Sequence, residues 1–315
     1  MATKPDTNNS ILQIGAELYR KTFKHIPGFH RAMHRVSMKL LFPALEAIQG
    51  FHTMPDDPFW FRFELLTGRH EPETGLQLQR LIKPGMTVLD IGAHVGYYTR
   101  RASDIVGANG RVIAFEPNPT NHAMLKKNVG NRDNVTLMQV ALAEEEGTAE
   151  LYDYLMMSAS GSLHYDETLR EVQLSTTQRD VDFAPRLDGE FQPQKYTVRT
   201  APVDTLIADA GVSRVDVVKM DIEGAEMGAL RGMKQTIANS PELALVMEYN
   251  PLGLKAFDNV PDESLQEVLE MGFSALYVIE ADGSLTDYTH QKEKLQQLTQ
   301  QLMSDMSVVN LLLTR

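Results

Sequence analysis

The chain has 315 residues, a formal net charge of −12 and no cysteine, and 43% of its residues are hydrophobic. This composition suits one large α/β domain with an extension, and it excludes a disulfide framework, a zinc–thiolate site and a catalytic thiol. The acidic charge argues against nucleic-acid binding, which needs clustered lysine and arginine. The N-terminus lacks an apolar signal core and no run of about 18 apolar residues occurs, so we expect a cytoplasmic protein.

The first distinctive segment is basic and lies between Leu18 and Leu40. Lysine and arginine recur there without any acidic residue, among apolar residues at roughly helical spacing, and Pro27-Gly28 divides the segment. We expect residues 1–70 to form a helical extension packed on the main domain with a solvated basic face. The alternative is a docking face for an anionic partner, namely a lipid surface, a phosphate-bearing sugar carrier or an acidic protein. No motif indicates the oligomeric state.

The stretch VLDIGAHVG, from Val88 to Gly96, predicts a buried strand that enters a glycine-bearing turn and then a helix. Glycine at the turn lets the backbone approach a ligand, and Asp90 at the strand end can accept hydrogen bonds from it. The next strand ends in Glu116. Its distance from the turn along the sequence is the one at which a carboxylate that binds ribose is found in nucleotide-binding folds. Together the two strand ends predict a cofactor that contains a nucleoside.

The spacing of the glycines narrows the choice of cofactor. A dinucleotide fingerprint reads G-x-G-x-x-G, whereas this turn reads D-x-G-x-x-x-G with His94 in the middle, so no backbone nest is fully open to a pyrophosphate. S-adenosylmethionine fits, with its ribose at Glu116 and its methionine part against Gly92 to Gly96. A nicotinamide-dependent oxidoreductase, a non-catalytic cofactor-binding scaffold and a plain tight turn are the alternatives.

From Met86 onward, strand and helix patterns alternate, which predicts a mostly parallel sheet. The segment from about 151 to 200 is too long for an ordinary connection and mixes glycine and proline with short β-like pieces, so we expect an inserted lid or hairpin within a domain over 71–315. The expected strands lie near 87–91, 111–116, 134–140, 215–221, 243–249, 274–279 and 306–313, and the expected helices near 96–106, 119–128, 225–238, 263–271 and 291–302.

Charged residues end two further strands. Lys219 and Asp221 share one face of the strand near 215–221, and a lysine inside a parallel strand is costly unless a carboxylate is close. The following strand ends in Glu248, with Asn250 just beyond it. If these strands are neighbours, Asp90, Asp221 and Glu248 gather at one edge of the sheet, and a cation must lie among them: Lys219, the cofactor's sulfonium or a divalent metal.

Two arrangements are open for this edge. In the first, Asp221, Glu248 and Asn250 supply oxygen ligands to magnesium, which would orient a hydroxyl and lower its pKa. In the second, lysine and carboxylates pair without a metal, and a side chain takes the proton. The candidates for that role are Asp221, Glu223, His94 and Lys219. His94 has an equally good structural interpretation as a helix-start residue hydrogen-bonded to the backbone.

Taken in order, these motifs resemble the FkbM-type S-adenosylmethionine-dependent methyltransferases over roughly Glu71 to Arg315. The resemblance implies a Rossmann-like class I methyltransferase sheet of seven strands, the last of them antiparallel. It also implies O-methylation of a hydroxyl on a sugar or natural product, by in-line transfer between two reactants held at near-attack distance. The segments that carry it are 71–74, 88–98, 114–118, 141–142 with Gly147, 203–206 and 218–226.

The resemblance also assigns roles to individual residues. Asp221 would face the substrate. Asp221 and Glu248-Tyr249-Asn250 further resemble the metal-binding strand ends of catechol-type O-methyltransferases, although those enzymes have no residue between the acid and the asparagine. The residues expected at the cofactor are Glu71, Asp90, Gly92, Ala93, Gly96, Tyr97, Glu116, Pro117, Asn118 and Ala141.

Overall fold

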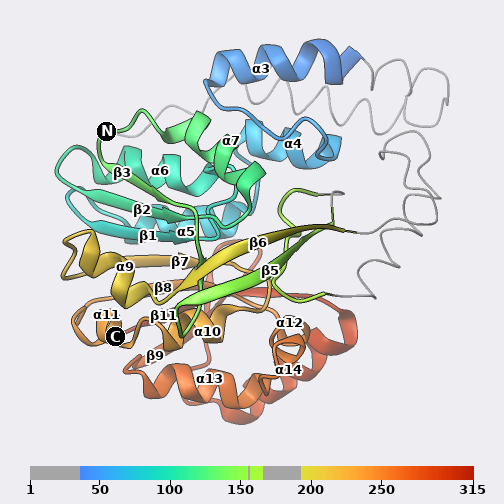
Figure 1. Cartoon of the computed structure of the whole chain (residues 1–315). Coiled ribbons are helices and arrows are strands. Elements are labelled where there is room, and N and C mark those ends of the chain that lie inside the picture. The colour runs from blue at the N-terminus through green and yellow to red at the C-terminus, as the bar shows by residue number, and fades with distance from the viewer. Residues whose placement is uncertain (1–35, 155–156, 166–192) are drawn as a thin grey trace.

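One sheet of eight strands forms the centre of the protein (Figure 1). The computed structural model describes residues 36–154, 157–165 and 193–315. From one edge of the sheet to the other, the strands are β10 (Leu285–Asp287), β9 (Ala275–Ile279), β11 (Val309–Thr314), β8 (Ala244–Tyr249), β7 (Val217–Met220), β1 (Thr87–Ile91), β2 (Arg111–Phe115) and β3 (Val135–Met138).

The directions of these strands confirm the predicted class of fold. β1, β2, β3, β7 and β8 run parallel to one another, whereas β11 runs antiparallel to β8 and β9. All seven expected strands are present. The eighth, β10, was not expected: the chain turns back after β9 at Gly283, whose φ is +76°, and pairs three residues with β9.

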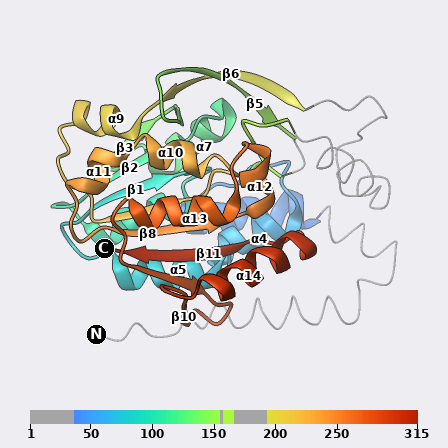
Figure 2. The same ribbon diagram turned by 90° about the horizontal axis from the view of Figure 1, so that it is seen from below.

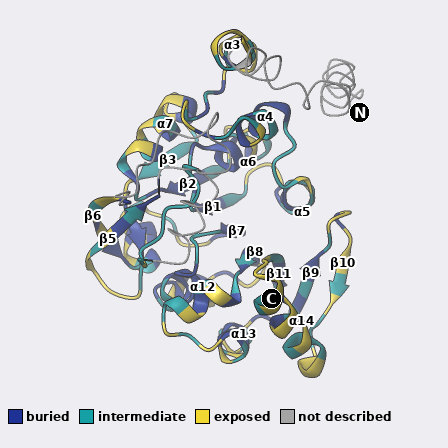
Figure 3. Ribbon diagram, turned by 90° about the vertical axis from the view of Figure 1, so that its right-hand side faces the viewer, coloured by how far each residue is buried: buried dark blue, intermediate teal, exposed yellow. Residues whose placement is uncertain are grey.

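Helices cover both faces of the sheet. α5 and α6 lie on one side and α12 and α13 on the other (Figure 3), and α13 lies along β8 and β11 (Figure 2). Among the described residues, none of the helices is both long and apolar enough to cross a membrane. The helices after residue 70 are α5 (Pro72–Leu81), α6 (Tyr97–Val106), α7 (Pro119–Val129), α9 (Val203–Asp209), α10 (Glu226–Arg231), α11 (Lys234–Ala238), α12 (Pro251–Ala256), α13 (Pro261–Glu270) and α14 (Lys292–Asp305).

The helix predicted over 225–238 is in fact two helices, α10 and α11. The break falls at Gly232, where an added Cβ would lie 2.2 Å from the carbonyl oxygen of Ala143. The chain therefore bends where its backbone packs against another segment. A local helical pattern could not reveal this contact, because Ala143 is distant in sequence.

A second, smaller sheet carries the insertion. It contains β4 (Ala141–Leu142), β6 (Gln194–Ala201) and β5 (Gly147–Asp153), in that order, with β5 and β6 antiparallel. These two long strands extend to one side of the main sheet (Figure 1). Most of the chain between them, residues 166–192, lies outside the described residues, so the insertion's role as a lid stays a prediction.

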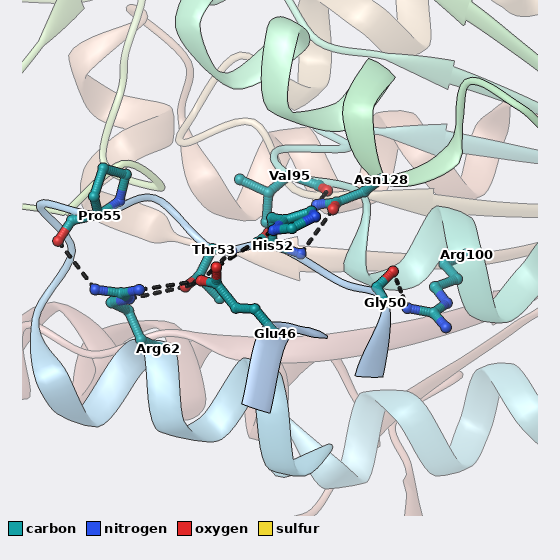
Figure 4. Close-up of polar contacts among 9 residues, drawn as sticks. All are labelled: Glu46, Gly50, His52, Thr53, Pro55, Arg62, Val95, Arg100 and Asn128. Atoms are coloured by element: carbon teal, nitrogen blue, oxygen red, sulfur yellow. Dashed lines mark hydrogen bonds and ion pairs between the residues drawn. The ribbon is translucent and has the colours of Figure 1, made fainter. Parts of the chain in front are cut away.

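The described part of the N-terminal region begins with η2 (Ser37–Leu41), α3 (Phe42–Gln49) and α4 (Phe59–Thr67). A buried arginine, Arg62, organises it: its guanidinium donates to Thr53 Oγ1 at 2.8 Å, Glu46 Oε1 at 3.1 Å and the carbonyl of Pro55 at 3.2 Å (Figure 4). Basic residues 18–35 lie outside the described residues, so docking on an anionic surface stays a prediction, as does the domain boundary near residue 70.

Asn128 of α7 ties this region to the main domain. Its Oδ1 accepts from the backbone N–H of His52, and its Nδ2 donates to the carbonyls of His52 and Val95, each at 2.8 Å (Figure 4). Arg100 of α6 donates to the carbonyl of Gly50 at 3.0 Å. The N-terminal region is therefore hydrogen-bonded to α7 and α6, and Asn128 links it to Val95 in the turn that follows β1.

We predict that Arg62→Met destabilises the protein by about 3 kcal/mol, because it leaves the mostly buried Glu46 carboxylate without its cation. Urea unfolding followed by circular dichroism measures this change. Arg199→Met is the matched control: Arg199 pairs with Glu146 on the surface, where both side chains are more than half exposed, so its loss should cost less than about 1 kcal/mol. Equal losses in the two variants would contradict the role assigned to Arg62.

Candidate active site

A cavity of about 250 Å³ opens at the carboxyl ends of β1, β2, β7 and β8. β1 lies between β2 and β7, so the chain leaves β1 toward one edge of the sheet and later returns on its other side; ligands bind at such switch points. The sequence-predicted residues that line the cavity are Glu71, Gly92, Ala93, His94, Tyr97, Glu116, Pro117, Asn118, Ala141, Lys219, Asp221, Glu223 and Glu248.

Three of the predicted residues lie behind this lining or beside it. Asp90 is buried under the turn, where its Oδ2 accepts from Thr99 Oγ1 at 2.5 Å. Gly96 is the N-cap of α6 with φ +91°. Asn250 is the N-cap of α12 and accepts from the backbone N–H of Gly253 at 2.9 Å. All three shape the loops around the cavity.

Gly92 permits a close approach, but the partner is the protein itself. Its φ is +78°, and an added Cβ would lie 1.8 Å from the carbonyl oxygen of Asp221. The turn after β1 is therefore pressed against the end of β7. The sequence predicts that Gly92 lets a ligand approach the backbone, whereas in the structure its missing side chain makes room for the end of β7.

Glu116 is held at the end of β2 by two backbone donors. Its Oε2 accepts from the N–H of His94 at 2.8 Å and its Oε1 from the N–H of Asn118 at 2.9 Å. The side chain is 5% exposed, and burial raises the pKa of Glu116 to about 7 despite these bonds. Each carboxylate oxygen keeps a lone pair, so the pair of hydroxyls on a ribose matches what this residue offers.

Lys219 supplies a cation at the centre of the site. Its Nζ lies 3.2 Å from Asp221 Oδ2 and 3.2 Å from the carbonyl oxygen of Gly92. Burial opposes charge on this lysine, but Asp221, Asp90 and Glu71 outweigh it and raise the pKa of Lys219 above its ordinary value. Of the two arrangements that the sequence left open, the side chains form the lysine–carboxylate cluster.

The other arrangement that the sequence left open, a magnesium site at Asp221, Glu248 and Asn250, is not supported. Among the described residues, no group of three or more histidine, aspartate or glutamate side chains is arranged to hold a metal ion. The side-chain oxygen of Asn250 caps α12 instead. A residue that reads as a metal ligand in the sequence therefore has a structural role.

The turn after β7 carries further acids. Glu226, which is 1% exposed, accepts from the N–H groups of Ile222 and Gly224 at 3.1 and 3.2 Å and so fixes the turn. Burial raises the pKa of Glu226 to about 7 and that of Glu223 to about 8, and Asp221 adds to both effects. Glu248 Oε2 is buried without a hydrogen-bond partner among the described residues. Such a set suits a ligand with positive charge.

Several cavity residues escaped the sequence analysis. Trp60 comes from α4 and Ser158 from the loop after β5, and both line the cavity. Tyr98 follows the predicted Tyr97 and donates from its hydroxyl to Glu71 Oε2 at 3.0 Å. Tyr98 could have been found as part of the turn motif, whereas no local pattern marks Trp60 or Ser158.

Comparison with known families places this site in context. Residues 90–275, more than half of the chain, match the sequence model of the methyltransferase FkbM domain. The chain belongs to the FkbM methyltransferase family. The resemblance noted in the sequence is thereby confirmed, and the match decides against a nicotinamide-dependent oxidoreductase.

Named relatives of this FkbM-family protein include two O-methyltransferases. The 2-O-methyltransferase NoeI of Sinorhizobium fredii is 27% identical over 189 residues, covering 56% of this chain and 71% of that protein. The 31-O-demethyl-FK506 methyltransferase FkbM of Streptomyces tacrolimicus is 29% identical over 181 residues, covering 54% of this chain and 66% of that protein. A crystal structure of a SAM-dependent methyltransferase from Aquifex aeolicus aligns with a TM-score of 0.38 and 14% identity, over 76% of this chain and 88% of that one.

The protein is therefore an S-adenosylmethionine-dependent methyltransferase. The residues present fit this cofactor, because Glu116 keeps lone pairs for ribose hydroxyls and the unpartnered oxygen of Glu248 suits a cationic group. When bound, S-adenosylmethionine supplies a methyl group already activated by its sulfonium.

We predict that Glu226 lowers stability as the pH rises. Its pKa is about 7 in the folded chain against an ordinary 4.5, so between these values the folded chain holds a proton that the unfolded chain has lost. The free energy of unfolding therefore falls as the pH rises through this window. Glu226→Gln removes the effect, and we expect its stability relative to wild type to increase by about 3 kcal/mol from pH 5 to pH 8.5.

Urea unfolding at both pH values measures this difference. The control is Glu263→Gln on α13, where the side chain is exposed, and its stability relative to wild type should be the same at both pH values. A Glu226→Gln difference that does not change with pH would contradict the assignment.

Proposed function

We propose that the protein transfers the methyl group to a hydroxyl oxygen of a sugar or another natural product. The observation that carries this proposal is the placement of the proton-accepting candidates Asp221, Glu223 and His94 around one cavity with Glu116. The names of two relatives, a 2-O-methyltransferase and a 31-O-demethyl-FK506 methyltransferase, support oxygen as the atom that receives the methyl group.

The protein's own contribution is to position, to shield and to accept a proton. A hydroxyl held in line with an activated methyl group needs little further chemistry, because orientation removes most of the barrier. Asp221, which is paired with Lys219, lies at the end of β7 and faces the cavity. Its free oxygen is placed to accept a hydrogen bond from the acceptor's hydroxyl.

The wall opposite the strand ends supports an acceptor with an apolar face. Trp60 lines the cavity and is 54% exposed, and Phe61, Leu65, Met157 and Leu163 lie in the same lining. An exposed indole at a cavity stacks on the carbon–hydrogen face of a sugar ring or on an apolar ring system. The identity of the acceptor is therefore sought among hydroxylated rings.

We predict that wild-type protein binds S-adenosylhomocysteine with micromolar affinity in a calorimetric titration. Glu116→Ala should weaken this binding at least about tenfold, because each lost hydrogen bond to a carboxylate costs roughly 1.5–3 kcal/mol. Glu145→Ala, a change of an exposed acid, is the control and should bind as wild type does. Equal affinity in the wild-type protein and the Glu116 variant would overturn the ribose assignment.

We predict that Asp221→Asn lowers methyl transfer to a panel of hydroxylated rings by about 100-fold while S-adenosylhomocysteine still binds. Transfer is measured with radiolabelled S-adenosylmethionine, once with magnesium and once with EDTA. Wild-type activity that requires magnesium would restore the metal site. Binding without transfer to any hydroxyl would favour the non-catalytic scaffold.

A further inference from the structure

A chain of hydrogen bonds joins three distant segments and ends in the cavity. Asp57 precedes α4, Ser158 follows β5, and His94 lies in the turn after β1. The hydroxyl of Ser158 donates to Asp57 Oδ2 at 2.7 Å, and its backbone N–H donates to Asp57 Oδ1, also at 2.7 Å. His94 Nε2 lies 2.5 Å from Ser158 Oγ. Only His94 of the three was marked by the sequence.

The direction of these bonds follows from their chemistry. A carboxylate is a stronger acceptor than a neutral imidazole, so the single hydroxyl proton of Ser158 points at Asp57. Ser158 Oγ then offers only lone pairs to His94. A 2.5 Å contact between nitrogen and oxygen needs a hydrogen between them, so that hydrogen belongs to Nε2.

The imidazole of His94 is neutral near pH 7. Burial, His70 and Lys219 together lower the pKa of His94 to about 3, and Asp221 opposes them. A neutral imidazole with hydrogen on Nε2 carries a lone pair on Nδ1. Among the residues that the structure describes, Nδ1 has no hydrogen-bond partner, and His94 lines the cavity.

We infer that Asp57 and Ser158 are positioning residues, which hold His94 in the Nε2–H tautomer so that Nδ1 accepts a hydrogen bond from a ligand hydroxyl. This inference rests on the proposed function. The hydroxyl belongs either to the methyl acceptor or to the ribose of the cofactor, because the backbone N–H of His94 bonds to Glu116. Either hydroxyl can donate the same kind of hydrogen bond to the lone pair on Nδ1.

Protonation of Asp57 reverses the direction of the hydrogen bonds from Asp57 through Ser158 to His94. Burial raises the pKa of Asp57 to about 6; the two bonds from Ser158 and the nearby Arg62 oppose this rise, and Asp56 adds to it. Below that pH the carboxyl group becomes a donor to Ser158 Oγ, so the hydroxyl proton turns to His94 Nε2 and the imidazole hydrogen moves to Nδ1. Nδ1 can then no longer accept from a hydroxyl.

The test reads the tautomer directly. Two-bond proton–nitrogen correlation spectra of the full chain distinguish the two imidazole tautomers, and the signal missing from His94→Asn assigns the residue. We expect the Nε2–H form at pH 7.5. In Asp57→Asn the side-chain amide donates to Ser158, so we expect the Nδ1–H form. Ser158→Ala should give a mixture, and Ser158→Thr should restore the Nε2–H form.

Ser160→Ala is the matched control, since Ser160 lies in the same loop and its hydroxyl donates to the carbonyl of Met157. It should leave the His94 signal unchanged. If His94 has the same tautomer in wild type, Ser158→Ala and Asp57→Asn, the inference is wrong.

Binding and kinetics identify the hydroxyl. If it belongs to the acceptor, Ser158→Ala lowers kcat/KM for the acceptor by about 10- to 100-fold and leaves S-adenosylhomocysteine affinity unchanged. If it belongs to the ribose, that affinity falls instead. No change in either quantity overturns the role of Nδ1. Absence of all transfer by wild type, with the Nε2–H tautomer and its response to Ser158→Ala intact, would count against the proposed function alone.

Discussion

The site depends on the attraction between the charged Lys219 and the carboxylates around it. A buried ammonium is costly in a parallel strand, and it is stable here because Asp221, Asp90 and Glu71 surround it. The benefit is mutual, since these carboxylates lie close together, repel one another and are each attracted to the ammonium group. The lysine also bonds to the carbonyl of Gly92, so the same charge joins the turn after β1 to the end of β7. Beside this cluster, burial raises the pKa values of Glu223 and Glu226, and Asp221 adds to both effects.

The parts of the fold that the sequence predicted are those with local signals. A buried strand that ends in glycine or an acid, as at Val88 to Gly96, can be recognised in the sequence, because the pattern shows where the strand ends. It also shows which end of the strand lies at the ligand-binding edge of the sheet. β10 was missed because it has only three residues, two of them exposed, and it is defined by pairing with β9. The break at Gly232 was missed because its cause, the backbone of Ala143, lies on another segment.

The same limit applies to the site. Four site residues lie at strand ends, namely Asp90, Glu116, Lys219 and Asp221. The sequence alone predicts that they lie close together, because the ends of parallel strands meet at one edge of the sheet. Asn250 follows a strand end as well, and a metal ligand and a helix cap read alike there. Asp57 and Ser158 are 101 residues apart in the chain, and only folding makes them neighbours. A short polar residue in a loop carries no sign of the partner that it will meet.

β11 lies between β8 and β9, and it is the last strand of the sheet to be synthesised. Until it emerges from the ribosome, β8 has a bare edge of unpaired amide and carbonyl groups beside the strand end that carries Glu248. The pairing of Val309 to Thr314 with a strand some 60 residues earlier closes that edge. Assembly of the cavity therefore waits for the synthesis of β11, and a nascent chain stalled before β11 is a target for chaperones and for aggregation.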